Sequence, residues 1–221
     1  MQFYKRKFLT TIAVAISTLM LSASCEQLGL TEDDDDTDLL VLLGIALTPE
    51  SCSGTCKMFL TSSVPSRNIG LTGLDNVCNS DANKPSGNIA FKALVTHSTD
   101  RIACTTANCS GGVSENVNWV LKPNTKYVRS DGTTEIFTTN SSGIFPFGTA
   151  NDGIVDPATN GIPTGLHIDW TNDLNCSDWS GAGSYEIGAP EELGVDMISL
   201  ESPTSCGSDL SGILRLACVE Q

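Results

Sequence analysis

The chain has 221 residues, 40% of them hydrophobic, which is enough for one domain of ordinary size with an N-terminal extension. Its formal net charge is −14, and it becomes −17 once the basic residues 5–7 of the N-terminal segment are removed. Like charge opposes contact with phosphate backbones and anionic glycans, so the composition excludes nucleic acid and heparin as expected partners and favours basic protein surfaces. Charge that serves only solubility is the alternative.

The first 24 residues are typical of a secretory signal. Residues 5–7 form its basic region, and the apolar core 8–21 is too short to cross a bilayer comfortably. Small residues at 22–24 precede Cys25, an order that looks like a relaxed, spirochaetal form of the bacterial lipoprotein signal, in which the cysteine receives the lipid. We therefore expect a membrane anchor on Cys25. The alternative is a plain secreted protein with an incidental cysteine.

Cysteine counting favours the lipid. The chain has nine cysteines, and setting Cys25 aside leaves eight, an even number suited to four disulfides in an oxidising compartment.

Residues 25–48 read as a lipidated tether. The acidic run between residues 32 and 38 repels itself and predicts an extended, disordered segment; sorting to a particular membrane or capture of cations is the alternative. The apolar run 39–47 is too short to span a membrane, and its pattern does not separate a buried strand from a helix. We expect it to dock onto the domain.

One domain is expected over residues 49–221, and it opens with a cysteine loop. Cys52 and Cys56 flank Gly54, which permits a tight turn, so a local disulfide is geometrically reasonable. Zinc is the rival interpretation for close cysteines, but no second C-x2-C pair is present and His97 and His167 stand alone. We expect no metal site.

The next elements are a strand at 57–62, a loop at 63–70, a helix at 72–85 and a strand at 89–96. Thr72 is the expected N-cap of the helix, and Pro85 is expected to end it. The helical spacing of Leu74, Val77, Cys78 and Ala82 places them on one face, so Cys78 should point inward.

The rest of the domain is rich in turns. Cys104 and Cys109 form a second short cysteine loop, and Trp119 is expected to anchor the core. Residues 122–127 and 151–164 read as loops, whereas the alternation in 166–170 predicts a strand.

No catalytic motif is found. The sequence lacks G-x-S-x-G, H-E-x-x-H and a P-loop, and the cysteines are expected to be oxidised. His97 and His167 are interpreted as surface or structural residues. We expect a protein that is not an enzyme and has no cofactor.

The C-terminal residues carry a specific resemblance. A C-x-x-W motif is followed by S-C and then by L-x-C-[VI]-E, here formed by Cys176, Trp179, Ser205, Cys206, Leu216, Cys218, Val219 and Glu220. Over about residues 57–221 the chain resembles the endostatin-type variant of the C-type-lectin-like fold, and within it the leptospiral endostatin-like lipoproteins. The resemblance implies an α+β domain with short strands, one or two helices and long loops.

The resemblance also implies two nested disulfides, Cys78 with Cys218 and Cys176 with Cys206. The other four cysteines are then best paired locally, Cys52 with Cys56 and Cys104 with Cys109, which is one choice among the 105 that eight cysteines allow.

Two activities known for related folds lack their residues here. Animal endostatins bind heparin through arginines and zinc through N-terminal histidines, but the chain beyond the signal has four arginines and no histidine before His97. Calcium-binding lectins use a Trp-Asn-Asp motif, of which Trp170, Asn172 and Asp173 are an imperfect version with one residue inserted. We expect Asn172 and Asp173 to form a turn through hydrogen bonds from side chain to backbone.

By resemblance, the expected function is adhesin-like: a lipoprotein at the outer surface of the outer membrane that binds host matrix proteins, such as laminin and fibronectin, or host plasma proteins. The long loops between residues 110 and 164 are expected to present the contacts, although no contact residue is identified. A structural envelope lipoprotein without a host ligand and a calcium-assisted glycan-binding lectin are the alternatives.

Overall fold

The computed structural model describes residues 52–62, 68–154, 161–206 and 214–221. All of them belong to one compact unit, Pro49–Gln221. The expected signal 1–24, the lipid site Cys25 and the segment 26–48 lie outside the described residues. Within the described ranges no helix is long and apolar enough to cross a membrane.

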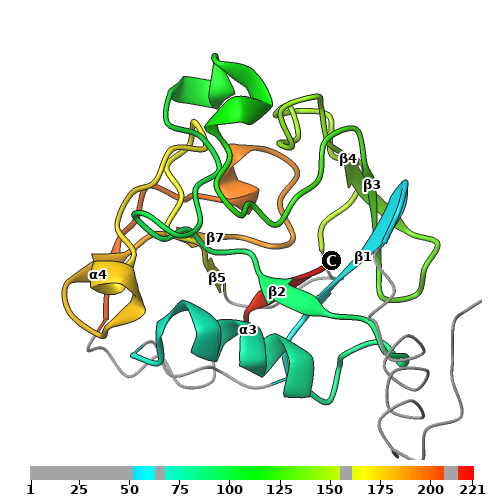
Figure 1. Ribbon diagram of the computed structural model, residues 1–221, viewed down its shortest axis with the longest axis horizontal. Coiled ribbons are helices and arrows are strands. Elements are labelled where there is room, and N and C mark those ends of the chain that lie inside the picture. Colours follow the sequence, from blue (N-terminus) through cyan, green and yellow to red (C-terminus); the bar gives the residue numbers. More distant parts are fainter. Residues whose placement is uncertain (1–51, 63–67, 155–160, 207–213) are drawn as a thin grey trace, which may run out of the picture. The chain divides into compact units, whose positions relative to one another are not determined.

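A five-stranded sheet organises the unit (Figure 1). β1 runs parallel to β3, and β9 is antiparallel to both of its neighbours, so the last strand of the chain lies inside the sheet. The strand order is β2 (Phe91–Ala93), β9 (Ala217–Glu220), β1 (Thr55–Leu60), β3 (Lys126–Arg129) and β4 (Glu135–Thr138).

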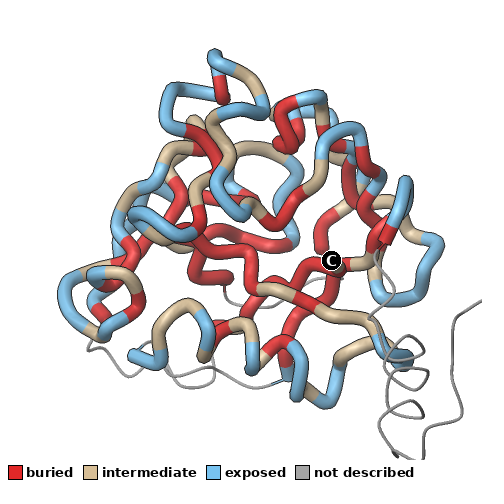
Figure 2. Tube along the Cα trace, viewed as in Figure 1, coloured by how far each residue is buried: buried red, intermediate tan, exposed pale blue. Residues whose placement is uncertain are grey.

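Burial explains why the C-terminal strand lies inside the sheet. All four residues of β9 are buried, and Figure 2 shows this strand and β1 in the buried centre of the described residues. A strand covered on both faces needs a continuous apolar run, and Leu216, Ala217, Cys218 and Val219 supply it.

Helix α3 (Gly70–Ser80) packs beside β2 and buries Leu74 and Cys78, which confirms the inward orientation of Cys78. The expected helix limits are wrong. Gly70 adopts φ 66° and turns the chain into the helix two residues before Thr72. The helix ends before Asp81, which is extended and whose carboxylate accepts the N–H of Asn83.

The remaining elements are short. Three 3-10 turns occupy Ala107–Cys109, Gly112–Glu115 and Val195–Met197. Two small ladders and one helical turn complete the described elements: β5 (Ile162–Pro163) with β7 (Ile187–Gly188), β6 (Ser184–Tyr185) with β8 (Thr204–Ser205), and α4 (Cys176–Trp179).

Three expected elements differ from the structure. The first strand begins at Thr55 rather than residue 57, and the strand expected at 89–96 forms a ladder only over Phe91–Ala93. The expected loop 122–127 contains the start of β3, because Lys126 and Tyr127 pair with both β1 and β4. The strand expected at 166–170 is a turn, described below.

Two apolar clusters fill the interior. One surrounds Trp170 and includes Phe145, and the partly buried Trp119 packs against it and donates its indole N–H to the Gly143 carbonyl at 3.0 Å. Trp119 therefore borders the core. The other cluster contains Trp179, Tyr185 and four of the cysteines.

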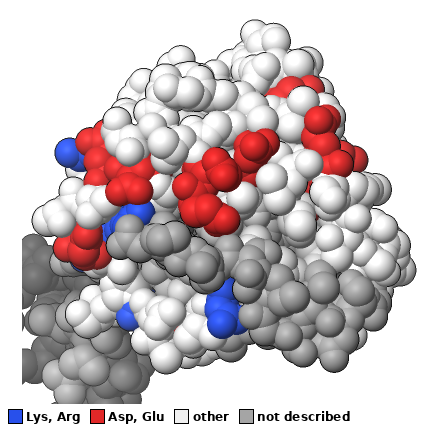
Figure 3. All heavy atoms as spheres, turned by 180° about the vertical axis from the view of Figure 1, so that it is seen from behind, with Lys and Arg blue, Asp and Glu red and all other residues white. Residues whose placement is uncertain are grey.

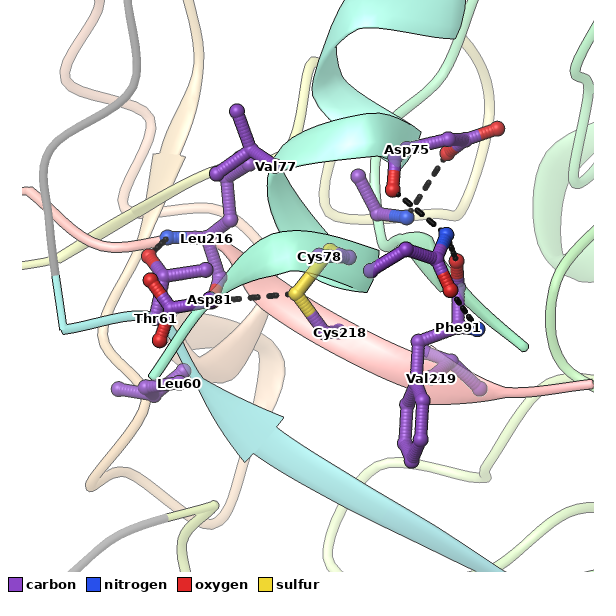
Figure 4. Close-up of a disulfide and its surroundings, with 12 residues drawn as sticks. Leu60, Thr61, Asp75, Val77, Cys78, Asp81, Phe91, Leu216, Cys218 and Val219 are labelled. Atoms are coloured by element: carbon purple, nitrogen blue, oxygen red, sulfur yellow. Dashed lines mark hydrogen bonds between the residues drawn. A yellow bond between two sulfur atoms is a disulfide. The ribbon is translucent and has the colours of Figure 1, made fainter. Parts of the chain in front are cut away.

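Four disulfides staple the domain: Cys52–Cys56, Cys78–Cys218, Cys104–Cys109 and Cys176–Cys206. They are the two nested pairs that the resemblance implies and the two local pairs expected beside them. Cys78 reaches down from α3 to Cys218 in β9 across a sequence separation of 140 (Figure 4). Hydrogen bonds also join α3 to the neighbouring strand β2, since Asp75 accepts the Ala93 N–H and the Asn79 side chain bonds the N–H and carbonyl of Phe91. The expected α+β class with few helices and short strands is confirmed.

Candidate functional site

A tight turn occupies residues 166–172, where the sequence predicts a strand. The N–H of His167 donates to the carbonyl of Thr171, and the N–H of Trp170 returns to His167. Asp169 holds the turn, since its carboxylate accepts both the N–H and the hydroxyl of Thr171. The sequence pattern of this segment is typical of a strand. The Asp169 carboxylate instead accepts the backbone N–H of Thr171, so this N–H needs no partner on a neighbouring strand.

Trp170 fixes this turn to the core. Its φ of 69° lies in the left-handed region. Its indole is fully buried, makes an edge contact with Phe145 and stacks on Phe147, with distances between ring centroids of 4.9 Å and 5.8 Å. The burial of this large aromatic side chain offsets the strained backbone. Trp170 is thus a structural anchor, although its buried Nε1 has no hydrogen-bond partner within the described residues.

Asn172 and Asp173 do not make the expected turn. The Asn172 side chain accepts from the Asn175 amide at 3.3 Å, and it is Asp169 that bonds the backbone of the turn. Asp173 instead belongs to a surface that sequence analysis missed, formed where three chain segments lie side by side.

Backbone hydrogen bonds define this three-segment arrangement. The Glu186 N–H donates to the carbonyl of Leu174 at 2.8 Å, and the Leu200 N–H donates to the carbonyl of Ile187 at 2.8 Å. The central segment around Glu186 is therefore flanked by Asp173 and Leu174 on one side and by Leu200 and Glu201 on the other. We call Asp173, Glu186 and Glu201, together with Leu174 and Leu200, the carboxylate surface.

Glu186 is the buried member of the carboxylate surface. The residue is 3% exposed, and its Oε2 has no hydrogen-bond partner within the described residues. Burial raises the pKa of Glu186, and the nearby charge of Asp173 raises it further, while a hydrogen bond from Ser199 opposes the shift. The charge of His167 also opposes the shift, but no lysine or arginine within the described residues pairs with Glu186.

His167 borders the carboxylate surface. Its Nδ1 lies 3.0 Å from Asp169, its Nε2 lies 3.8 Å from Glu201, and its side chain is 40% exposed. The hydrogen bond with Asp169 raises the pKa of His167, although partial burial acts in the other direction. His167 therefore links the turn at Asp169 to the carboxylate surface, and its ion-pair partners within the described residues are carboxylates.

The neighbouring helical turn α4 has an unusual backbone. All four residues, Cys176–Trp179, have positive φ between 49° and 62°, a conformation that non-glycine residues adopt at a cost of about 1 to 2 kcal/mol each. Two contacts hold α4 in this conformation. One is the Cys176–Cys206 disulfide, and the other is the Trp179 indole N–H, which donates to the Thr96 carbonyl at 2.7 Å. Asp178 accepts the N–H and hydroxyl of Ser98, and these bonds lower its pKa although burial acts to raise it.

Both histidines contact neighbouring backbone or carboxylate groups. His97 uses Nδ1 to accept the N–H of Asp100 at 3.1 Å and so closes its own turn. Every described cysteine is in a disulfide. No group of three or more His, Cys, Asp or Glu side chains in the described part of the chain is placed to hold a metal ion.

Charge is distributed unevenly along the domain. Residues 161–206 contain eight Asp and Glu residues and no Lys or Arg, whereas residues 52–154 contain seven acidic and eight basic residues. Figure 3 shows acidic side chains gathered in groups on one face, with Lys and Arg as scattered spots. The 46 residues from 161 to 206 contain no lysine or arginine, and this pattern was the sequence signal for the carboxylate surface.

Residues 62–193 match the family described as "Protein of unknown function (DUF1554)". The chain belongs to this family. The match extends across α3, the turn at Trp170 and Glu186, but β1 and β9 of the DUF1554 protein's main sheet lie outside it. A search of curated proteins found no match.

Proposed function

We propose that this protein is a lipid-anchored binding protein of the cell surface, related to the leptospiral endostatin-like lipoproteins. Cys25 carries the lipid in the outer membrane, residues 25–48 form the tether, and the domain contacts host matrix or plasma proteins. The single observation that supports this proposal is the nested pair of bridges, Cys78–Cys218 around Cys176–Cys206, which accords with the endostatin-type, C-type-lectin-like scaffold.

The way the loops are held also favours binding. The loop at Cys104 is closed by its own disulfide and by Glu115, whose carboxylate accepts the N–H and hydroxyl groups of Thr105 and Thr106. Loops ordered in this way on a stapled scaffold lose little conformational entropy when they bind a partner.

Catalysis is not part of the proposal. The histidines serve turns, and the described cysteines are oxidised, so the arrangement offers neither an oriented base beside a nucleophile nor a thiolate.

Two experiments test the proposal. Protease treatment of intact cells should degrade the protein, and its survival would contradict surface exposure. The refolded domain 49–221 should bind at least one member of a panel of matrix and plasma proteins at about 0.15 M salt, where interactions between distant exposed charges are screened. Binding to no member of the panel at this salt would contradict the proposed function.

A further inference from the structure

We propose that the carboxylate surface binds a lysine or arginine side chain from an extended basic segment of a partner protein. This inference rests on the proposed binding function and adds the chemistry of the partner. Four observations carry it: the charge of the segment, the state of Glu186, the flanking leucines and the lack of an arranged metal site.

The first observation is the missing counter-charge. Within the described residues, the ion pairs made by carboxylates of 161–206 have histidine as the cation: Asp169 and Glu201 with His167, and Asp178 with His97. By contrast, Arg101 and Arg129 are paired with Asp75 and Asp152. The carboxylate surface therefore faces a single histidine, His167, and no lysine or arginine within the described residues, so its net charge is negative.

The second observation is Glu186. A buried carboxylate without its full set of hydrogen bonds costs free energy, and the Oε2 of Glu186 is such a group. An ammonium or guanidinium group supplies donors and positive charge together. Glu201 and His167, the neighbouring charged groups that act on Glu186, have side chains that are 61% and 40% exposed.

The third observation is the apolar border. Leu174 is 41% exposed and Leu200 is 39% exposed, and they lie on opposite sides of the segment that carries Glu186. An extended peptide places successive side chains on alternating sides, so a cationic side chain and its apolar neighbours can contact these groups together. A free metal ion gains nothing from the two leucines.

The fourth observation separates this ligand from a divalent cation. Metal sites need several oxygen ligands at fixed short distances. No described group of three such side chains meets that condition, whereas a single ammonium or guanidinium group needs only one well-placed carboxylate and a negative surround.

The test uses the refolded domain 49–221 and a synthetic peptide of repeating Lys-Leu-Lys-Ser, with a matched peptide in which Glu replaces Lys. Isothermal calorimetry at about 0.15 M salt should detect the basic peptide only. Glu186→Gln should weaken binding about thirtyfold, because it removes the buried charge. Glu201→Gln should weaken it about threefold and reduce its salt dependence, since Glu201 is exposed, and this variant should fold normally.

Glu135→Gln is the matched control. It removes the same charge from β4 and keeps the oxygen that accepts from Asn151, so peptide affinity should stay within twofold of wild type. Equal weakening by all three variants, or no binding of the basic peptide at this salt, overturns the proposal. Calcium that raises the melting temperature of wild type, but not of Glu186→Gln, also overturns it, in favour of a metal site.

The inference and the proposed function fail separately. If a host protein binds wild type, Glu186→Gln and Glu201→Gln equally, the binding function stands and the carboxylate surface is not its site. If no host protein binds but the basic peptide binds and depends on Glu186, the inference stands without the adhesin role.

Discussion

Residues 52–154 and 161–206 use their charges in opposite ways. In the first region, charged groups hold the fold: Arg101 bonds both carboxylate oxygens of Asp75, and Arg129 bonds Asp152. In the second region, Glu186 is buried without a lysine or arginine partner among the described residues, and the Glu201 side chain is 61% exposed. The two arginine ion pairs of the first region therefore stabilise the fold, as Asp169 and Asp178 do in the second, whereas the carboxylate surface remains available for binding.

The largest expected effect concerns the bridge that ties the two ends of the domain together. Cys78→Ser combined with Cys218→Ser opens a loop with a sequence separation of 140, so the free energy of unfolding should fall by roughly 4 to 5 kcal/mol. Cys104→Ser with Cys109→Ser opens a loop with a separation of 5 and should cost roughly 2 to 3 kcal/mol. Urea denaturation measures both. Equal losses would show that the long bridge adds no more than a local staple.

Removing one partner of the paired charges should also destabilise the first region. Asp75→Ala leaves Arg101, which is 3% exposed, without its carboxylate and should lower the free energy of unfolding by about 3 kcal/mol. Asp100→Ala is the reference variant. The Asp100 side chain is 70% exposed, so its removal should change the free energy of unfolding by less than about 0.5 kcal/mol. Similar losses in both variants would contradict the role assigned to Asp75.

Acid should release the Glu115 loop over a defined pH window. Hydrogen bonds from Thr106 are the main cause that lowers the pKa of Glu115 to about 2 from 4.5. Its contribution to stability is therefore fully present above pH 4.5 and is lost as the pH falls toward 2. Amide hydrogen exchange at residues 105–111 should increase over this window in wild type and be fast at every pH in Glu115→Gln. Unchanged protection down to pH 2 would contradict the clamp.

Glu186 should change the pH dependence of stability in the direction opposite to Glu115, because its pKa is raised rather than lowered. Its effect on stability is the smallest of those predicted. Its pKa is raised in the folded state, so the ionised form costs stability as the pH rises above the ordinary value of a glutamate. Glu186→Gln should therefore leave stability unchanged or increase it at pH 7, and should flatten its pH dependence between pH 4 and 7. A clear loss at pH 7 would mean that Glu186 serves the fold, as Asp75 does.

Patterns set by local chemistry were predictable from sequence. The helical spacing of Leu74 and Cys78 identified the inward face of α3. The long-range bridges came from the resemblance, because eight cysteines alone leave the pairing open.

Other features were not predictable, because a side chain takes the place of a backbone hydrogen-bond partner or because separate segments come together. The pattern at 166–170 reads as a strand, but Asp169 bonds Thr171 and turns the chain instead. The β3 and β4 hairpin was missed, although Asp131 and Gly132 are typical of such a turn. The carboxylate surface joins three separate segments, so its geometry follows only from tertiary structure; its charge was readable in the sequence.

The most direct test of the central claim is competition. A host protein that binds the domain is immobilised, and the Lys-Leu-Lys-Ser peptide is added at saturating concentration in about 0.15 M salt. The account predicts that the basic peptide displaces the wild-type domain and that its Glu counterpart does not. Retention of the domain at saturating basic peptide would contradict the claim that binding uses the carboxylate surface.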